Sequence, residues 1–193
     1  MFKNVYTTGF LIFIVIMISF FVTYIFFLDQ NYYRTSISLS AFLLPLIFAI
    51  GAFLSVNSFV KNRSRVSFKE AYGRAFIPMF VGGILSLVSI FLFINYVDKD
   101  TKDLLNYQYI ESFERSLDEE YQKGVNVFKP GSEEMLDIEK KYAQGKERIE
   151  NKRIAKEDMF GFKYFGYIFA GYCAYFLLLS LFFGSFFRTR TIV

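Results

Sequence analysis

The chain has 193 residues, of which 54% are hydrophobic and 21% aromatic, and its formal net charge at pH 7 is +4. A soluble domain of this size cannot bury so much apolar surface, so the composition excludes an ordinary soluble protein and predicts an integral membrane protein. The absence of histidine removes the commonest metal ligand and the usual near-neutral acid–base group. The single cysteine, Cys173, permits no internal disulfide.

Four long uncharged runs predict four transmembrane helices. Each run has about 20 residues or more, the length that an α-helix needs to cross a hydrocarbon layer of about 30 Å. The runs cover residues 9–28, 37–60, 75–97 and 164–187. The first run ends in two Phe residues and Leu28 rather than in small residues, so we interpret it as a retained anchor and not as a signal peptide. The sequence therefore predicts an all-α, polytopic membrane protein with a single membrane domain over residues 1–193.

Basic residues beside the spans predict their orientation, because Lys and Arg flanks stay on the cytoplasmic side. Lys3 precedes the first span, Arg188 and Arg190 follow the last, and the first connection holds only Arg34. The connection between the second and third spans is the most basic, and it holds Lys61, Arg63, Arg65, Lys69 and Arg74. We expect both termini to be cytoplasmic and the chain to lie in a bacterial inner membrane.

The same five basic residues are candidate contacts for anionic lipid headgroups or for a partner. The simpler interpretation is that any cytoplasmic connection shows this charge bias. The third span also begins with a capping box, Ser67-Phe68-Lys69-Glu70, in which the two polar side chains satisfy each other's backbone amides.

Residues 98–158 differ in composition from the rest, with 16 acidic and 12 basic residues and a net charge of −4. Such a segment is solvated outside the membrane, and its charge argues against nucleic acid as a partner. Apolar side chains at a spacing of three to five residues predict an amphipathic helix that ends near Gly124. These side chains are Leu105, Ile110, Phe113, Leu117 and Tyr121.

A second helix is predicted after this one, because Pro130 and Gly131 form a turn signal and Ser132 is a suitable helix cap. We therefore expect an extracytoplasmic helical hairpin between the third and fourth spans. Its apolar stripe is either covered by the second helix, which we favour because short connections make antiparallel helices neighbours, or free as a docking face.

Small residues at a spacing of four predict close helix contacts in two spans. They are Gly82 and Ser86 in the third span, and Gly166, Ala170 and Ala174 in the fourth. Such stripes pack either within the bundle or between copies of the chain, and we favour packing within the bundle.

The segment Ser67-Phe68-Lys69-Glu70-Ala71-Tyr72 at the mouth of a span, with Asn95-Tyr96-Val97-Asp98 at its end, resembles a bacterial family of four-span membrane proteins. That family is a domain of unknown function, frequent in Bacteroidetes-type bacteria, with the pattern S-F-K-E-A-[FY] at the start of the third span. The likeness covers most of the chain, including the charged insert and the short basic tail. It implies the fold and the membrane location, and it supplies no catalytic or binding residues.

No stretch of the sequence pairs a nucleophile with a base, forms a phosphate cradle or clusters metal ligands. We therefore predict no enzymatic activity, no cofactor and no metal. The spans contain no Asp, Glu, Lys or Arg, which disfavours a proton-coupled carrier. The working hypothesis is a membrane-anchored scaffold of the cell envelope, whose partners are the lipid bilayer and another envelope protein or a second copy. The alternative is a small permease or channel-like subunit for neutral or amphipathic solutes.

Overall fold

A computed structural model describes residues 4–29, 31–61 and 63–189, and this part of the chain contains helices and no strand. Its six α-helices are α1 (Val5–Phe27), α2 (Tyr32–Val60), α3 (Phe68–Leu92), α4 (Lys99–Val127), α5 (Glu133–Ile154) and α6 (Phe162–Phe187). A short π-helical segment, Phe93–Val97, continues α3 directly. The predicted all-α class is therefore confirmed.

Four of these helices are long and apolar enough to cross a membrane, which indicates a multi-pass membrane protein. They are α1, α2, α6 and the continuous segment Phe68–Val97. Each helix begins before the apolar run that predicts it, because the run marks only the part suited to hydrocarbon. The first turns can remain polar, since they lie where headgroups and water reach the backbone.

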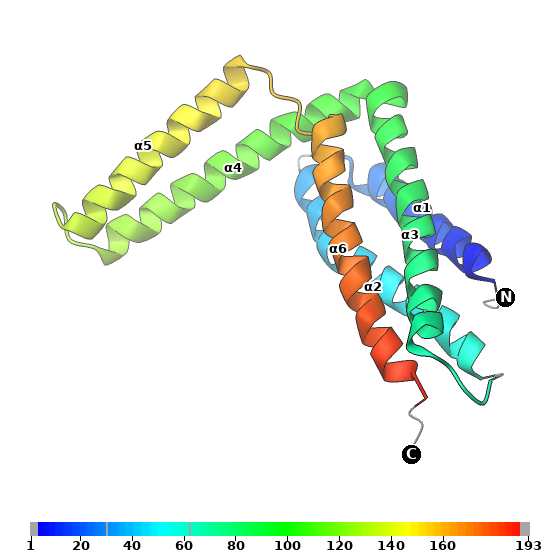
Figure 1. The fold of residues 1–193 in the computed structure, drawn as a ribbon. Coiled ribbons are helices and arrows are strands. Elements are labelled where there is room, and N and C mark those ends of the chain that lie inside the picture. Colours follow the sequence, from blue (N-terminus) through cyan, green and yellow to red (C-terminus); the bar gives the residue numbers. More distant parts are fainter. Residues whose placement is uncertain (1–3, 30, 62, 190–193) are drawn as a thin grey trace.

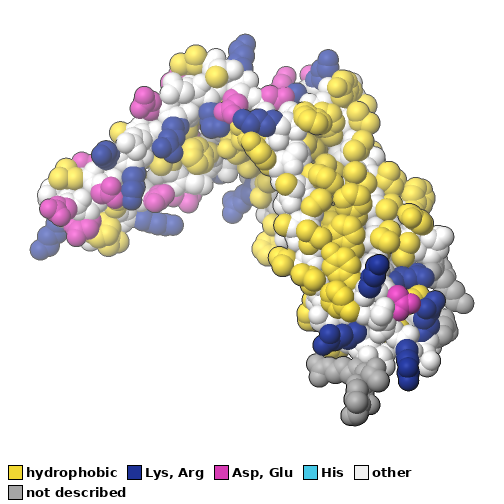
Figure 2. Space-filling view, viewed as in Figure 1, with side chains coloured by type: hydrophobic (Ala, Val, Ile, Leu, Met, Phe, Trp, Pro, Cys, Tyr) yellow, Lys and Arg dark blue, Asp and Glu magenta, His cyan; other side chains and the backbone are white. Residues whose placement is uncertain are grey.

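The four apolar helices form a bundle in which α3 packs against α1, α2 and α6 (Figure 1). Buried side chains from all four fill its centre, among them Ile16, Phe48, Met79 and Phe176. Figure 2 shows apolar side chains along the bundle, with Lys and Arg gathered at its lower end. This surface suits lipid on its flank and water at its ends.

Two spans approach each other closely where α1 crosses α3. A Cβ atom added at Gly82 would lie 2.7 Å from the carbonyl oxygen of Gly9, and equally close to Ile12. Ser86 is buried one turn further on, and its hydroxyl donates to the carbonyl of Gly82 at 2.8 Å. The predicted close contact in the third span is confirmed.

The small-residue stripe of α6 behaves differently. A Cβ atom at Gly166 would meet nothing within 4 Å, and Ala170 and Ala174 are exposed. The expectation that this stripe packs within the bundle is wrong, because α6 turns the face with Phe165 and Phe176 inward. Large aromatic side chains bury more apolar area than small ones, so they occupy the interface.

The start of α3 shows the predicted capping box. The Ser67 hydroxyl accepts from the amide of Glu70 at 3.3 Å, and the Glu70 carboxylate accepts from the amide of Ser67 at 2.9 Å. Two backbone donors that a helix start leaves unpaired are thereby satisfied.

Candidate functional site

The helices α4 and α5 project sideways from one end of the bundle, and we call this pair the arm (Lys99–Ile154; Figure 1). The two helices pack against each other along a seam. Gly145 brings α5 close to Leu117, since a Cβ atom there would lie 2.6 Å from Leu117 Cδ2. The rings of Tyr121 and Tyr142 stack with centroids 4.4 Å apart. The seam is thus built from close glycine contacts and aromatic stacking.

The five apolar positions predicted on α4 as a docking stripe are divided among three environments. Leu105 is buried against the end of the bundle, beside Tyr32. Leu117 and Tyr121 meet α5, and Ile110 is half-buried. Phe113 alone of the five remains exposed, with 42% of its surface accessible. The stripe is therefore not one continuous exposed face, and docking at Phe113 stays a prediction.

Asp98 fixes the first turn of the arm to the first span. Its carboxylate accepts from the Tyr24 hydroxyl at 2.7 Å, and from the amide and hydroxyl of Thr101 at 3.0 and 2.7 Å. The bond from Tyr24, helped by those from Thr101, holds the pKa of Asp98 below its usual value, because each bond favours the charged form. Asp98 is thus both the cap of α4 and its tie to α1.

Gln108 ties the arm to the connection between the first two spans. Its side chain is 5% exposed. It accepts from the backbone amide of Tyr33 and donates to the backbone carbonyl of Asp29, both at 2.7 Å. One amide side chain therefore pairs with an amide that the start of α2 leaves unpaired and with a carbonyl of the α1–α2 connection, which also accepts from the amide of Tyr32 at 3.2 Å.

A third tie joins α4 to the connection that leads into α6. Asn106 donates to the Asp158 carboxylate at 3.2 Å and accepts from the amide of Met159 at 2.9 Å, while Lys102 pairs with Asp158 at 2.6 Å. Burial acts to raise the pKa of Asp158, but the bonds from Lys102 and Asn106 outweigh it and lower the pKa.

We call Tyr24, Asp98, Asn106, Gln108 and Asp158 the collar. These residues connect the base of α4 to the first span, to the α1–α2 connection and to the entry of α6. Three separate attachment points fix a direction, whereas one would act as a hinge. The collar therefore holds the arm at a defined angle to the bundle.

Charged residues further along the arm pair across the seam. Glu114 contacts Lys146 at 3.0 Å and Arg153 at 2.5 Å, and Asp118 contacts Lys146 at 2.9 Å. Lys146 lowers the pKa of both carboxyls, and its own pKa is raised by them.

In residues 4–29, 31–61 and 63–189, no three His, Cys, Asp or Glu side chains are grouped so that they could hold a metal ion.

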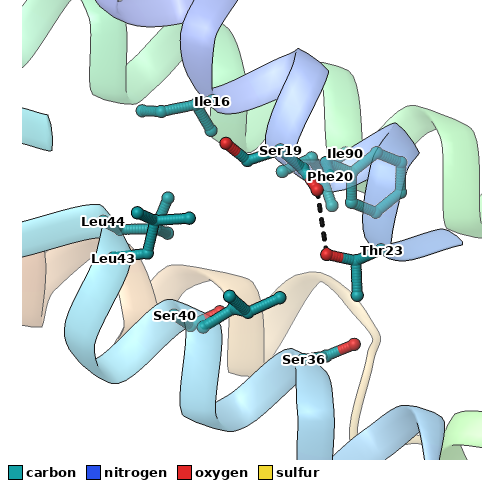
Figure 3. Close-up of a pocket in the computed structure, with 10 residues that line it drawn as sticks. Ile16, Ser19, Phe20, Thr23, Ser36, Ser40, Leu43, Leu44 and Ile90 are labelled. Carbon is teal, nitrogen blue, oxygen red and sulfur yellow. Dashed lines mark hydrogen bonds between the residues drawn. The ribbon is translucent and has the colours of Figure 1, made fainter. Parts of the chain in front are cut away.

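A small cavity of about 70 Å³ lies between α1 and α2 (Figure 3). Four hydroxyl residues line it, together with apolar side chains such as Leu44 and Ile90. The hydroxyl residues are Ser19, Thr23, Ser36 and Ser40. The Thr23 hydroxyl donates to the carbonyl of Ser19 at 2.9 Å, so it already has a partner. The volume suits a few water molecules rather than a solute.

The basic turn predicted to contact headgroups lies at the opposite end of the bundle from the arm (Figure 2). The guanidinium groups of Arg63 and Arg74 each lie 4.3 Å from the centre of the Phe59 ring, and Arg63 also pairs with Glu70 at 2.9 Å. The three remaining members, Lys61, Arg65 and Lys69, are exposed. Part of this basic charge thus has partners in the chain, and contact with lipid stays a prediction.

Thr189, two residues after the end of α6, is held beside this turn, a contact that the sequence did not indicate. The amide of Thr189 donates to the carbonyl of Val66 at 2.9 Å, and the amide of Val66 donates to the Thr189 hydroxyl at 3.1 Å.

Of the collar residues, only Asp98 carried a sequence signal, as a helix-cap residue type at the start of the insert. Tyr24, Asn106 and Gln108 are single polar residues whose partners are remote in sequence.

Residues 7–189 match a family described as protein of unknown function (DUF4199). The chain belongs to this family. No curated protein and no solved structure matches the chain. Membership of DUF4199 confirms the predicted resemblance to a domain of unknown function. The Bacteroidetes-type origin stays a prediction, and so does the expectation that the family shares the pattern at Ser67–Tyr72.

Proposed function

We propose that the chain is a membrane-anchored scaffold of the cell envelope, in which the bundle holds the arm as an extracytoplasmic hairpin and presents it to another envelope protein. The collar carries this proposal. A linker that only joined two spans would need no fixed direction, whereas this one is tied to the bundle at three places. A rigid support lowers the entropy lost when a partner binds the arm.

The side of the membrane follows from the distribution of charge. The basic turn and Thr189, after the end of α6, lie together at one end of the bundle, and the net acidic arm lies at the other (Figure 2). Basic connections are retained in the cytoplasm, so we place the basic end inside, both termini with it, and the arm outside a bacterial inner membrane. We assign no catalytic activity to the chain, in line with the chemistry available in the sequence.

A permease or channel-like subunit is the second candidate, and the hydroxyl-lined cavity between α1 and α2 is the observation that favours it. Large side chains fill the middle of the bundle, however, and Phe48, Met79 and Phe176 are all buried there. A solute would have to displace them to cross. The cavity suits bound water better than a path, so we prefer the scaffold.

Phe113 gives the most direct test, because it is the exposed member of the five apolar positions predicted as a docking stripe on α4. A photoreactive amino acid would be placed at Phe113, and in a matched variant at Leu117, which lies under α5. Crosslinking in living cells should yield one defined product from position 113 and none from position 117. The product would be identified and then reformed from the two purified proteins.

Either of two results would count against a scaffold. One is the absence of any product from position 113 and from Gln144, which is exposed on α5, with the protein at normal levels. The other is a product formed equally well from position 117, since Leu117 packs against Gly145 of α5 and would meet a partner as readily as Phe113 only if the arm came apart. Uptake of a labelled neutral solute into vesicles containing the purified chain would favour the permease.

A further inference from the structure

The arm does not continue the axis of the bundle. It leaves the end of α3 and runs away to one side, and its far turn bends back to the level of the first turns of α6 (Figure 1). The apolar helices of the bundle are the segments able to cross the membrane. An arm that leaves their end sideways therefore runs along the membrane surface. The collar fixes that direction through contacts such as Tyr24 with Asp98.

The far turn exposes apolar side chains that the seam does not need. The seam ends with Met135, which is buried, and with Ile138, which packs against Gly124. A Cβ atom added at Gly124 would lie 2.7 Å from Ile138 Cδ1. Beyond it, Val127 is 73% and Leu136 55% exposed. Phe128 and Val125 add further exposed apolar surface at the same turn. Apolar groups gathered at one exposed tip are typical of a contact surface.

The side of α4 that meets the bundle is polar along the rest of its length. Leu105 and Gln108 mark this side by their contacts. Helical spacing places Ser112, Arg115 and Glu119 on the same side, and all three are either exposed or half-buried. A polar helix side suits the headgroup layer, whereas an apolar tip suits the boundary between headgroups and acyl chains.

We propose that the far turn of the arm, residues 125–129 with Leu136, inserts its apolar side chains into the interface of the same bilayer that the bundle crosses. The arm then has two supports, the collar at its base and the membrane at its tip. Lys123 and Lys129 flank the turn and are exposed, so their ammonium groups can reach lipid phosphates while their stems lie against apolar surface. This proposal does not depend on the scaffold function.

The test uses the full chain with Cys173→Ser, reconstituted into vesicles of phosphatidylethanolamine and phosphatidylglycerol. An environment-sensitive dye would be attached at Val127→Cys and, as a matched control, at Gln144→Cys on exposed α5. We expect blue-shifted emission at position 127, quenched when nitroxide lipids are included and insensitive to iodide. The dye at position 144 should show the reverse pattern.

Because an attached dye is itself apolar, a second measurement leaves the natural tip intact. The dye is placed at Asn126→Cys, and its quenching by nitroxide lipids is compared with and without Phe128→Glu. We expect the charged side chain to reduce the quenching. Equal quenching by nitroxide lipids with and without Phe128→Glu would overturn the proposal, as would quenching of the dye at position 127 by iodide. So would a blue shift at position 127 without lipid quenching that fades as protein is diluted in lipid, since that pattern indicates contact with a second copy.

Discussion

The Tyr24 hydroxyl donates a 2.7 Å hydrogen bond to the Asp98 carboxylate, and this contact joins the last turn of α1 to the first turn of α4. The two residues are 74 positions apart in sequence. The bond links the first span to the arm through a charged acceptor, and hydrogen bonds to charged groups are among the stronger ones in proteins.

Tyr24→Phe removes the donor and keeps the ring. We expect a loss of about 1.5 kcal/mol in the free energy of unfolding in detergent, the lower end of the range for a bond to a charged acceptor. The arm should also become less well oriented, seen as a broader distribution of spin-label distances between α5 and α3. Tyr6→Phe is the control, because Tyr6 lies on the same helix and is 64% exposed. A narrow distribution in Tyr24→Phe would show that the remaining collar contacts suffice.

Acid should weaken the same contact. The pKa of Asp98 is lower in the folded chain than its usual value of about 4, because Tyr24 and Thr101 bond its charged form. Asp98 therefore contributes stability above the unfolded pKa, and this contribution is lost as the pH falls through the folded pKa. Other carboxyls whose pKa is lowered by folding, such as that of Glu114, lose their contribution to stability in the same acidic pH range.

A comparison with Asp98→Asn isolates the contribution of this carboxyl. The melting temperature of the natural chain should exceed that of the variant at pH 7, and the gap should close as the pH is lowered below about 4. A gap that stays constant down to acid pH would assign the effect to packing rather than to charge.

The hydrogen bonds of Gln108 predict a separate loss of stability at the α1–α2 connection when this side chain is removed. Gln108→Ala leaves the amide of Tyr33 without its partner, at a cost of about 1 to 3 kcal/mol for a buried group. The carbonyl of Asp29 loses one donor and keeps the amide of Tyr32 at 3.2 Å. Hydrogen exchange at Tyr33 should accelerate, while exchange in the middle of α3 stays slow. Gln122→Ala, at an exposed position on the same helix, should change neither. Unchanged exchange at Tyr33 would mean that water replaces the side chain.

How far the sequence predicts this structure depends on the range of each interaction. The spans and the capping box of Ser67 and Glu70 arise from neighbouring residues, and both were predictable. The collar depends on pairs such as Asn106 with Asp158, which the fold brings together and no local pattern marks. The stripe at Gly166 shows a further limit, because spacing identifies a smooth helix face but not which face turns inward.

The two glycine stripes give a prediction with a built-in control. Gly82→Ala should destabilise the bundle by about 1 to 3 kcal/mol, the usual cost of overpacking, because the new Cβ would lie 2.7 Å from a backbone oxygen that cannot move alone. Gly166→Ala adds the same atom where nothing lies within 4 Å. It should be neutral, or stabilising because alanine favours helix. Equal losses in both variants, measured by unfolding in mixed micelles, would contradict the crossing of α1 and α3.

Orientation in the membrane is the last prediction, and labelling of single cysteines tests it. In a Cys173→Ser background, Gln144→Cys lies at an exposed position of α5 in the arm and Ser64→Cys lies in the basic turn at the other end of the bundle. The positive charge beside Ser64 predicts that this residue lies in the cytoplasm. A membrane-impermeant maleimide added to spheroplasts should therefore label position 144 alone, and disruption of the membrane should expose position 64. Labelling of both from outside would contradict the single membrane crossing, by Phe68–Val97, that separates the basic turn from the arm. Labelling of position 64 alone would keep the fold and reverse its orientation, which would move the arm, and any partner it binds, into the cytoplasm.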